Sequence, residues 1–135
     1  MNELTRARIW SILNDGFEAI HETTLSSDLD VKVKSGHQRN PAFLFWAYAE
    51  FSLAGRTIVI SFNIKRREAK IEVWGDIARE DGFVVKDIIR TEIEETVDYE
   101  NRLVDLALKF VADCEKETEL IVQELRPNGL VSSDS

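Results

Sequence analysis

The residues best suited to chemistry are few in this 135-residue chain, and they are scattered along it. His21 and His37 are the only histidines, and neither has a cysteine or carboxylate nearby at the spacing that metal ligands need. Cys114 is the single cysteine and cannot form a disulfide within the chain. No glycine-rich phosphate loop, nucleophile elbow or zinc-binding histidine motif occurs. The sequence therefore predicts no catalytic residue, metal site or cofactor, which favours a protein that is not an enzyme.

Three carboxylates could still be combined into an acid–base set, because Glu50, Glu72 and Asp76 fall on one face of the strands expected below. In the expected register, Lys86 lies opposite Asp76 and Arg90 lies opposite Glu72. A structural ladder of ion pairs is the simpler interpretation of these charges.

An alternation of apolar side chains in residues 42–65 is the strongest pattern in the chain. The apolar positions are Phe43, Phe45, Ala47, Ala49, Phe51 and Leu53, followed by Ile58, Ile60, Phe62 and Ile64. A strand turns successive side chains to opposite faces, so the pattern predicts two strands with one core face each. A hairpin about Ala54 and Gly55 pairs Phe51 with Ile58 and Phe45 with Ile64. A slip of one residue would turn one apolar set away from the core, so this register is strongly specified.

Two further strands continue the sheet. A turn near residues 67–68 would pair Ile64 with Ile71, Phe62 with Val73, and Ile60 with Gly75. Residues 83–93 could begin the final helix or form a fifth strand. The strand register would align three opposite-charge pairs: Asp76 with Lys86, Glu72 with Arg90, and Lys70 with Glu92. Such pairs stabilise a sheet by a few tenths up to about 1 kcal/mol each, which favours the strand.

Helical periodicity marks both ends of the chain. In residues 2–21, Trp10, Leu13, Phe17 and Ile20 recur at helical spacing. A polar connector at 23–27, an alternating strand at 29–34 and a loop at 35–41 lead into the first long strand. A last helix should begin at residues 96–99 and end near Arg126, before Pro127. Its apolar stripe is Leu103, Ala107, Phe110, Cys114, Ile121 and Leu125, and residues 103–111 are apolar enough to contact the first helix, a partner or both.

The expected fold is therefore α+β. An N-terminal helix, a five-stranded antiparallel meander sheet and a long C-terminal helix form a two-layer sandwich, with both helices on one face of the sheet. Residues 1–127 are expected to form a single α+β domain, and residues 128–135 a frayed C-terminal tail.

The charge distribution limits the classes of partner that the chain is expected to bind. The net charge is −8, and residues 92–126 hold 11 of the 25 acidic residues but only 4 of the 17 basic ones. Nucleic-acid binders usually show the opposite balance, so no nucleic acid is expected. No apolar run is long enough to span a membrane, and no signal-peptide pattern opens the chain. These features and the single cysteine indicate a cytoplasmic protein.

The face of the sheet without helices provides the main functional clue. It should carry an aromatic patch with a charged border, which is typical of an interaction surface. The candidate partner-binding residues are Trp46, Tyr48, Glu50, Glu72, Trp74, Asp76 and Ile88. Alternatively, a loop or the chain's own tail covers this face, or water simply solvates it.

The most favoured function is a non-catalytic protein-binding module that binds a protein partner or a second copy of itself as a homodimer, with the acidic residues attracting a basic partner. In size, acidity and order of elements the chain is similar to two classes of small acidic bacterial proteins, toxin-immunity proteins and secretion chaperones. The alternative is a small-molecule-binding or enzymatic domain with a pocket between sheet and helices. The small core-face residues Ala47, Ala49 and Gly75 could leave room for such a ligand.

Overall fold

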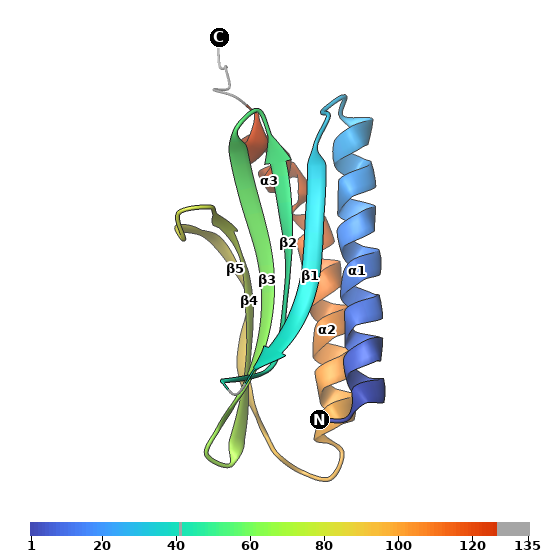
Figure 1. Cartoon of the computed structure of the whole chain (residues 1–135), viewed down its shortest axis with the longest axis vertical. Helices are drawn as coiled ribbons and strands as arrows, with labels where there is room; N and C mark the ends of the chain where they lie inside the picture. The colour runs from blue at the N-terminus through green and yellow to red at the C-terminus, as the bar shows by residue number, and fades with distance from the viewer. Residues whose placement is uncertain (41, 127–135) are drawn as a thin grey trace.

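A layer of helices lies against one face of a five-stranded sheet in the computed structural model, which describes residues 1–40 and 42–126, without the side chains of residues 39 and 40 (Figure 1). The elements are α1 (Glu3–Ser26), β1 (Lys32–Asn40), β2 (Phe43–Leu53), β3 (Arg56–Arg67), β4 (Lys70–Arg79), β5 (Val84–Glu94), α2 (Tyr99–Lys116) and α3 (Thr118–Leu125). The strands are antiparallel and follow one another in chain order across the sheet. The expected α+β fold with a meander sheet is confirmed.

The core lies between the two layers. The odd-numbered side chains Phe45, Ala47, Ala49 and Phe51 of β2 are fully buried. All six residues of the predicted apolar stripe in the C-terminal helical segment are buried as well. Helices α1 and α2 run side by side, so the additional apolar surface of residues 103–111 contacts the N-terminal helix (Figure 1).

Helix α1 is longer than predicted. The Asn2 side chain caps its first turn by accepting a hydrogen bond from the Thr5 backbone N–H at 2.8 Å. The helix continues to Ser26 through the segment predicted as a connector. There the hydroxyls of Thr23 and Ser26 donate to carbonyls four residues earlier, and Thr24 is buried, so polar residues that favour turns are accommodated in the helix.

The C-terminal helix begins at Tyr99, within the predicted range, but it is not one long helix. It breaks at Glu117, whose backbone leaves the helical region with φ −100° and ψ 16°, and α3 follows. No helix in the described part of the chain has the length and apolar character needed to cross a bilayer. The predicted tail, residues 128–135, lies outside the described residues.

The predicted register of β2 with β3 is confirmed, with Phe51 opposite Ile58 and Phe45 opposite Ile64. The predicted register of β3 with β4 is wrong by two residues. Ile64 lies opposite Val73 rather than Ile71, and Phe62 lies opposite Gly75.

The turn between β3 and β4 explains this error. It is formed by Glu68 and Ala69, with Arg67 opposite Lys70, so it is centred one residue later than predicted. Glu68 adopts φ 58°, a left-handed conformation that glycine usually provides. Because the shift is even, every apolar side chain still faces the core.

Strand β5 is present as predicted, but its register is wrong. Trp74 lies opposite Arg90, and the pairing shifts twice, between Gly75 and Asp76 and between Ile77 and Ala78. None of the three predicted charge pairs forms by direct cross-strand pairing. Lys70 and Glu92 still meet diagonally, with Nζ and Oε1 3.7 Å apart.

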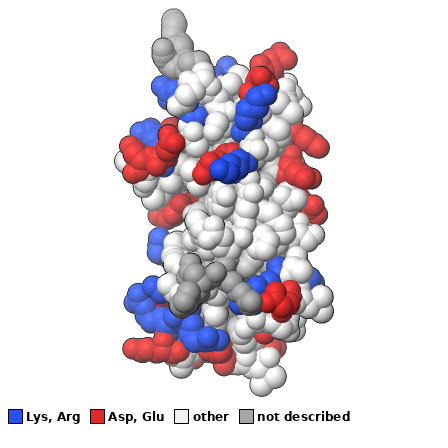
Figure 2. Space-filling view, viewed as in Figure 1, with Lys and Arg blue, Asp and Glu red and all other residues white. Residues whose placement is uncertain are grey.

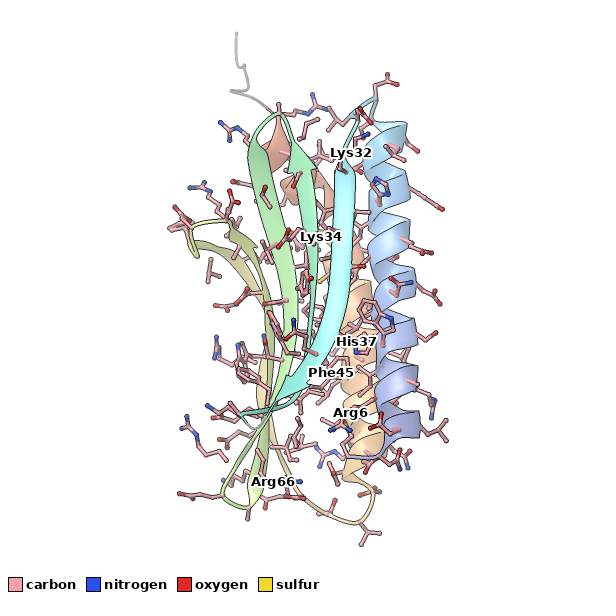
Figure 3. All side chains as sticks on the ribbon, viewed as in Figure 1. Arg6, Lys32, Lys34, His37, Phe45 and Arg66 are labelled. Atoms are coloured by element: carbon pink, nitrogen blue, oxygen red, sulfur yellow. The ribbon has the colours of Figure 1, made fainter. Side chains whose placement is uncertain are left out.

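Strand β1 includes most of the segment predicted as a loop at 35–41, since it runs from Lys32 to Asn40. Gly36 pairs with Tyr48 and Gln38 with Trp46. His37 interrupts the apolar pattern but faces the helices, where its ring lies 4.6 Å from the Trp10 ring and 5.9 Å from the Phe45 ring between centroids (Figure 3).

Candidate functional site

The candidate site is the face of the sheet that turns away from all three helices (Figure 1), here called the open face. It comprises the even-numbered side chains of residues 32–38, 46–52 and 70–78, the odd-numbered side chains of residues 57–67, and Asp87, Arg90, Glu92 and Glu94. These positions are in register with Trp46 and Tyr48 across the sheet.

One row of side chains crosses all five strands of the open face. The tryptophan row consists of Gln38, Trp46, Asn63, Trp74 and Arg90. The ring centroid of Trp46 lies 5.4 Å from that of Tyr48, and the centroid of Trp74 lies 5.8 Å from that of Phe43. The Lys65 Nζ lies 5.8 Å from the Phe43 ring centroid. Two pairs of aromatic rings therefore flank Asn63.

Asn63 is only 5% exposed although it belongs to the open face. Its Nδ2 donates to the Trp74 backbone carbonyl at 3.2 Å and to the Ser61 Oγ at 3.5 Å. The buried amide thus ties the centre of the tryptophan row to the backbone of β4.

The position of Tyr48 requires a glycine at position 36, which has no Cβ. A Cβ at position 36 would lie 3.1 Å from the Tyr48 phenol oxygen and 3.2 Å from its Cε1. The tyrosine ring therefore lies over β1, and the aromatic surface extends to the first strand.

The carboxylates of the open face do not form the predicted ion-pair ladder. Asp76 lies opposite Asp87, and it accepts a hydrogen bond from the Ser61 Oγ at 3.5 Å. Burial raises the pKa of Asp76, and the neighbouring Asp87 carboxylate raises it further, whereas Arg90 opposes the shift.

The remaining predicted partners are also rearranged. Lys86 lies opposite Ile77, and its Nζ pairs with Glu117 at 3.2 Å, on the side of the helices. Glu72 is paired with Arg67, with 3.6 Å between Oε1 and Nε, and Glu50 lies between Lys34 and Val59 on the neighbouring strands.

Two hollows lie beside the aromatic rings. One of about 650 Å³ lies next to Trp74 and is bordered by the charged side chains of Lys65, Arg67, Glu72, Arg90 and Glu92. A smaller one of about 250 Å³ is lined by Gln38, Trp46, Tyr48, Glu50, Val59 and Ser61. Each hollow offers an aromatic wall and polar groups at its border.

The structure places six of the seven candidate residues, all but Ile88, in register on the open face. Ile88 was expected opposite Trp74, but it lies where the β4–β5 pairing is irregular and packs against the hydrophobic core. The sequence interpretation missed Gly36 and Gln38 because their segment was predicted as a loop. It missed Asp87 because of the wrong register, and Phe43 because that residue was assigned to the core face.

Cys114 and His21 lie outside the open face. Burial raises the pKa of the Cys114 thiol far above its usual range, so the thiol stays protonated at neutral pH. The Nε2 of His21 lies 2.6 Å from the Val31 carbonyl oxygen, in a hydrogen bond that fixes the segment after α1. Among the described residues, no three His, Cys, Asp or Glu side chains gather closely enough to hold a metal ion.

The fold and this face define a two-layer α+β protein with an aromatic sheet surface. Comparison with protein-family models, with curated proteins and with solved structures gave no match to this chain.

Proposed function

We propose that the chain is a non-catalytic protein-binding module and that the open face is its binding surface. The observation that carries this proposal is that Trp46, Tyr48 and Trp74 are only partly buried on a sheet face that no helix in the described part of the chain covers. Tryptophan and tyrosine are the side chains that most often dominate the binding energy of protein interfaces, because they bury a large area and keep a polar group available.

The open face is also held in place before any partner arrives. Asn63 is hydrogen-bonded beneath the tryptophan row, and Gly36 accommodates the ring of Tyr48. Rigid anchors lose little conformational entropy on binding, which increases affinity for a given contact area. A small acidic chain of this build would suit a module of the immunity-protein or secretion-chaperone kind.

The charged border would orient a partner rather than supply most of the affinity. Glu72 was expected to attract a basic partner, but Arg67 already pairs with it, and Arg90 pairs with Asp87 at 3.6 Å. Exposed ion pairs of this kind contribute little stability and mainly affect association rate and orientation.

Affinity capture with immobilised chain tests the proposal. The Trp46→Ala/Trp74→Ala variant should lose the proteins that the unchanged chain retains. The matched control is Leu108→Ala, which removes a 51% exposed apolar side chain from α2 in the helix layer and should retain them. Circular dichroism establishes that both variants are folded. Equal capture by all three proteins would contradict the proposal.

A further inference from the structure

The charges of the open face are divided between its two halves. The half formed by β1, β2 and β3 carries four bases (Lys32, Lys34, Lys65 and Arg67) and one acid, Glu50. The half formed by β4 and β5 carries five acids, Glu72, Asp76, Asp87, Glu92 and Glu94. Its bases are Lys70 and Arg90. The described side chains therefore give one half a net charge of +3 and the other −3, and the open face as a whole is neutral.

The helix layer has a different character. Residues 95–126 carry nine acids and four bases. Acidic side chains line the right-hand side of Figure 2, whereas basic side chains gather at the lower left, near the ends of β3 and β4. Two copies would repel each other through their helix layers, but no net repulsion opposes contact between two open faces.

We infer that the open face binds a second copy of this chain, face to face, about a two-fold axis that runs along β3. This inference rests on the proposed function, for which it names the partner. An axis parallel to the strands exchanges β1 with β5 and β2 with β4. Strands β1 and β2 of one copy, whose Lys32, Lys34 and Glu50 give a net charge of +1, then cover the −3 half of the other copy, and the isologous interface repeats this contact twice. Lys65 and Arg67 of β3 lie near the axis, where β3 faces the β3 of the partner subunit.

The aromatic residues fit the same axis. Trp46 and Trp74 lie in one row, one strand to either side of Asn63 on β3. The axis therefore places Trp46 of each copy against Trp74 of the partner subunit, and the two stacked sheets pack about 10 Å apart.

Polar groups of the open face also gain partners in this arrangement. The row next to the tryptophan row contains Tyr48 on β2 and Asp76 on β4, on opposite sides of Ser61. The axis brings the Tyr48 hydroxyl to the Asp76 carboxylate of the partner subunit, and Gln38 to the partner's Arg90. Asp76, which among the described residues accepts a 3.5 Å hydrogen bond from Ser61, thereby gains a stronger donor.

A charge swap between β1 and β5 tests this geometry by sedimentation of the purified full chain. Asp87 shares its row with Gly36, so Lys34 of the partner subunit reaches it diagonally, from two residues along β1. The unchanged chain should be a dimer, and Lys34→Glu or Asp87→Lys alone should weaken it about threefold, because each change reverses two such diagonal contacts per dimer. Combining both changes should restore the dimer. Within one chain the two residues lie at opposite edges of the sheet, about 19 Å apart at 4.8 Å per strand, so rescue can arise only between copies.

Two controls separate the possible results. Arg8→Glu makes the same charge change at an exposed position of α1 and should leave the dimer intact. Mixing Gln38→Cys with Arg90→Cys protein should give a crosslink between copies with a thiol-reactive crosslinker that spans the gap of about 10 Å between the stacked sheets, and neither variant alone should form one.

Different outcomes would overturn different statements. A monomer at about 100 μM would overturn the second-copy inference, and the capture experiment would still decide the proposed function. Single variants that weaken the dimer without rescue in the double variant would overturn the β1-to-β5 arrangement. A dimer that Trp46→Ala/Trp74→Ala does not weaken would show that copies associate through another surface.

Discussion

The ring of Phe110 occupies the space that any side chain at Gly75 would need. A Cβ at position 75 would lie 2.7 Å from the Ser61 carbonyl oxygen and closer still to Phe110 Cε1. The Phe110 ring also packs on Phe62, with 5.0 Å between centroids. The glycine lets α2 approach the sheet, and the Phe110 ring fills the space beside Gly75.

Replacing Gly75 with alanine should therefore lower the free energy of unfolding by about 2–3 kcal/mol, because the added methyl group meets backbone as well as a buried ring. Urea denaturation measures the loss. Gly55→Ala is the control, since position 55 has open space around it and only its φ of +84° is unfavourable, which costs about 1 kcal/mol. Equal losses in the two variants would contradict a packing role for Gly75.

A second close contact joins the two long helices. A Cβ at Gly16 of α1 would overlap the Val111 side chain of α2, so Gly16→Ala should cost about 1–3 kcal/mol. Val111→Ala removes the obstructing methyl groups, and the double variant should lose about 1 kcal/mol less than the sum of the two single losses. Thermal unfolding of the three variants measures these losses of stability. If the loss in the double variant equalled the sum of the two single losses, the alanine at position 16 would not be strained against Val111, and the predicted overlap would be wrong.

The alternation of apolar residues predicted most of the fold because it determines which side chains face the core. It cannot detect an even shift, since moving a strand by two residues leaves every face unchanged. The β2–β3 turn was found from the Ala54–Gly55 signal. The β3–β4 turn has Glu68 in a left-handed conformation, and no glycine marks it.

The candidate site was predicted in outline for the same reason. Trp46, Tyr48 and Trp74 face away from the core in the predicted register and in the observed one, because the two differ by an even number of residues. Their common face could therefore be inferred from the alternation of side chains along each strand. The charge partners could not, because two irregularities in the β4–β5 pairing turn Lys86 toward the helices and bring Asp87 opposite Asp76. The extension of β1 was not predicted, because its positions opposite Ala49 and Ala47 hold the polar residues Ser35 and His37 and the apolar alternation ends before them.

The raised pKa of Asp76 predicts a pH-dependent effect of Asp76→Asn. The folded state binds this proton more tightly than the unfolded chain does, so the resulting stability is present below the unfolded pKa and is lost as the pH rises through the folded pKa. The variant should be more stable than the unchanged chain at pH 7, with the difference vanishing near pH 3, about the unperturbed range of a carboxyl group. Thermal unfolding across this range measures it.

Asp113→Asn should show the opposite sign and provides the control. Hydrogen bonding and charge from Lys109, 2.9 Å away, and the charge of Lys116 lower the pKa of Asp113. Its contribution is present above the unfolded pKa and is lost at acid pH, so this variant should be a few tenths of a kcal/mol less stable at pH 7. An Asp76→Asn protein less stable than the unchanged chain at neutral pH would contradict the assignment for Asp76.

Asn63 should be the least replaceable polar residue of the open face. Asn63→Asp removes the two hydrogen bonds that Nδ2 donates and places a carboxylate beside the Trp74 carbonyl, in a position that is 5% exposed. A buried charge without donors is costly, so we expect a loss of about 2–4 kcal/mol at pH 7. Urea denaturation at two pH values measures the loss. Because burial raises the pKa of the introduced carboxyl, the loss should shrink as the pH falls and the protonated acid can again donate to the carbonyl.

The control for this variant is Ser61→Ala, which removes only contacts of 3.5 Å and should change the free energy of unfolding by less than about 0.5 kcal/mol. If Asn63→Asp were as stable as the unchanged chain at pH 7, water would have to reach position 63. The tryptophan row would then not be held rigidly, and the preorganisation argued for the open face would be wrong. A loss that is large at pH 7 and small at pH 4 would instead show that the rings of Trp46 and Trp74 exclude water from the amide between them.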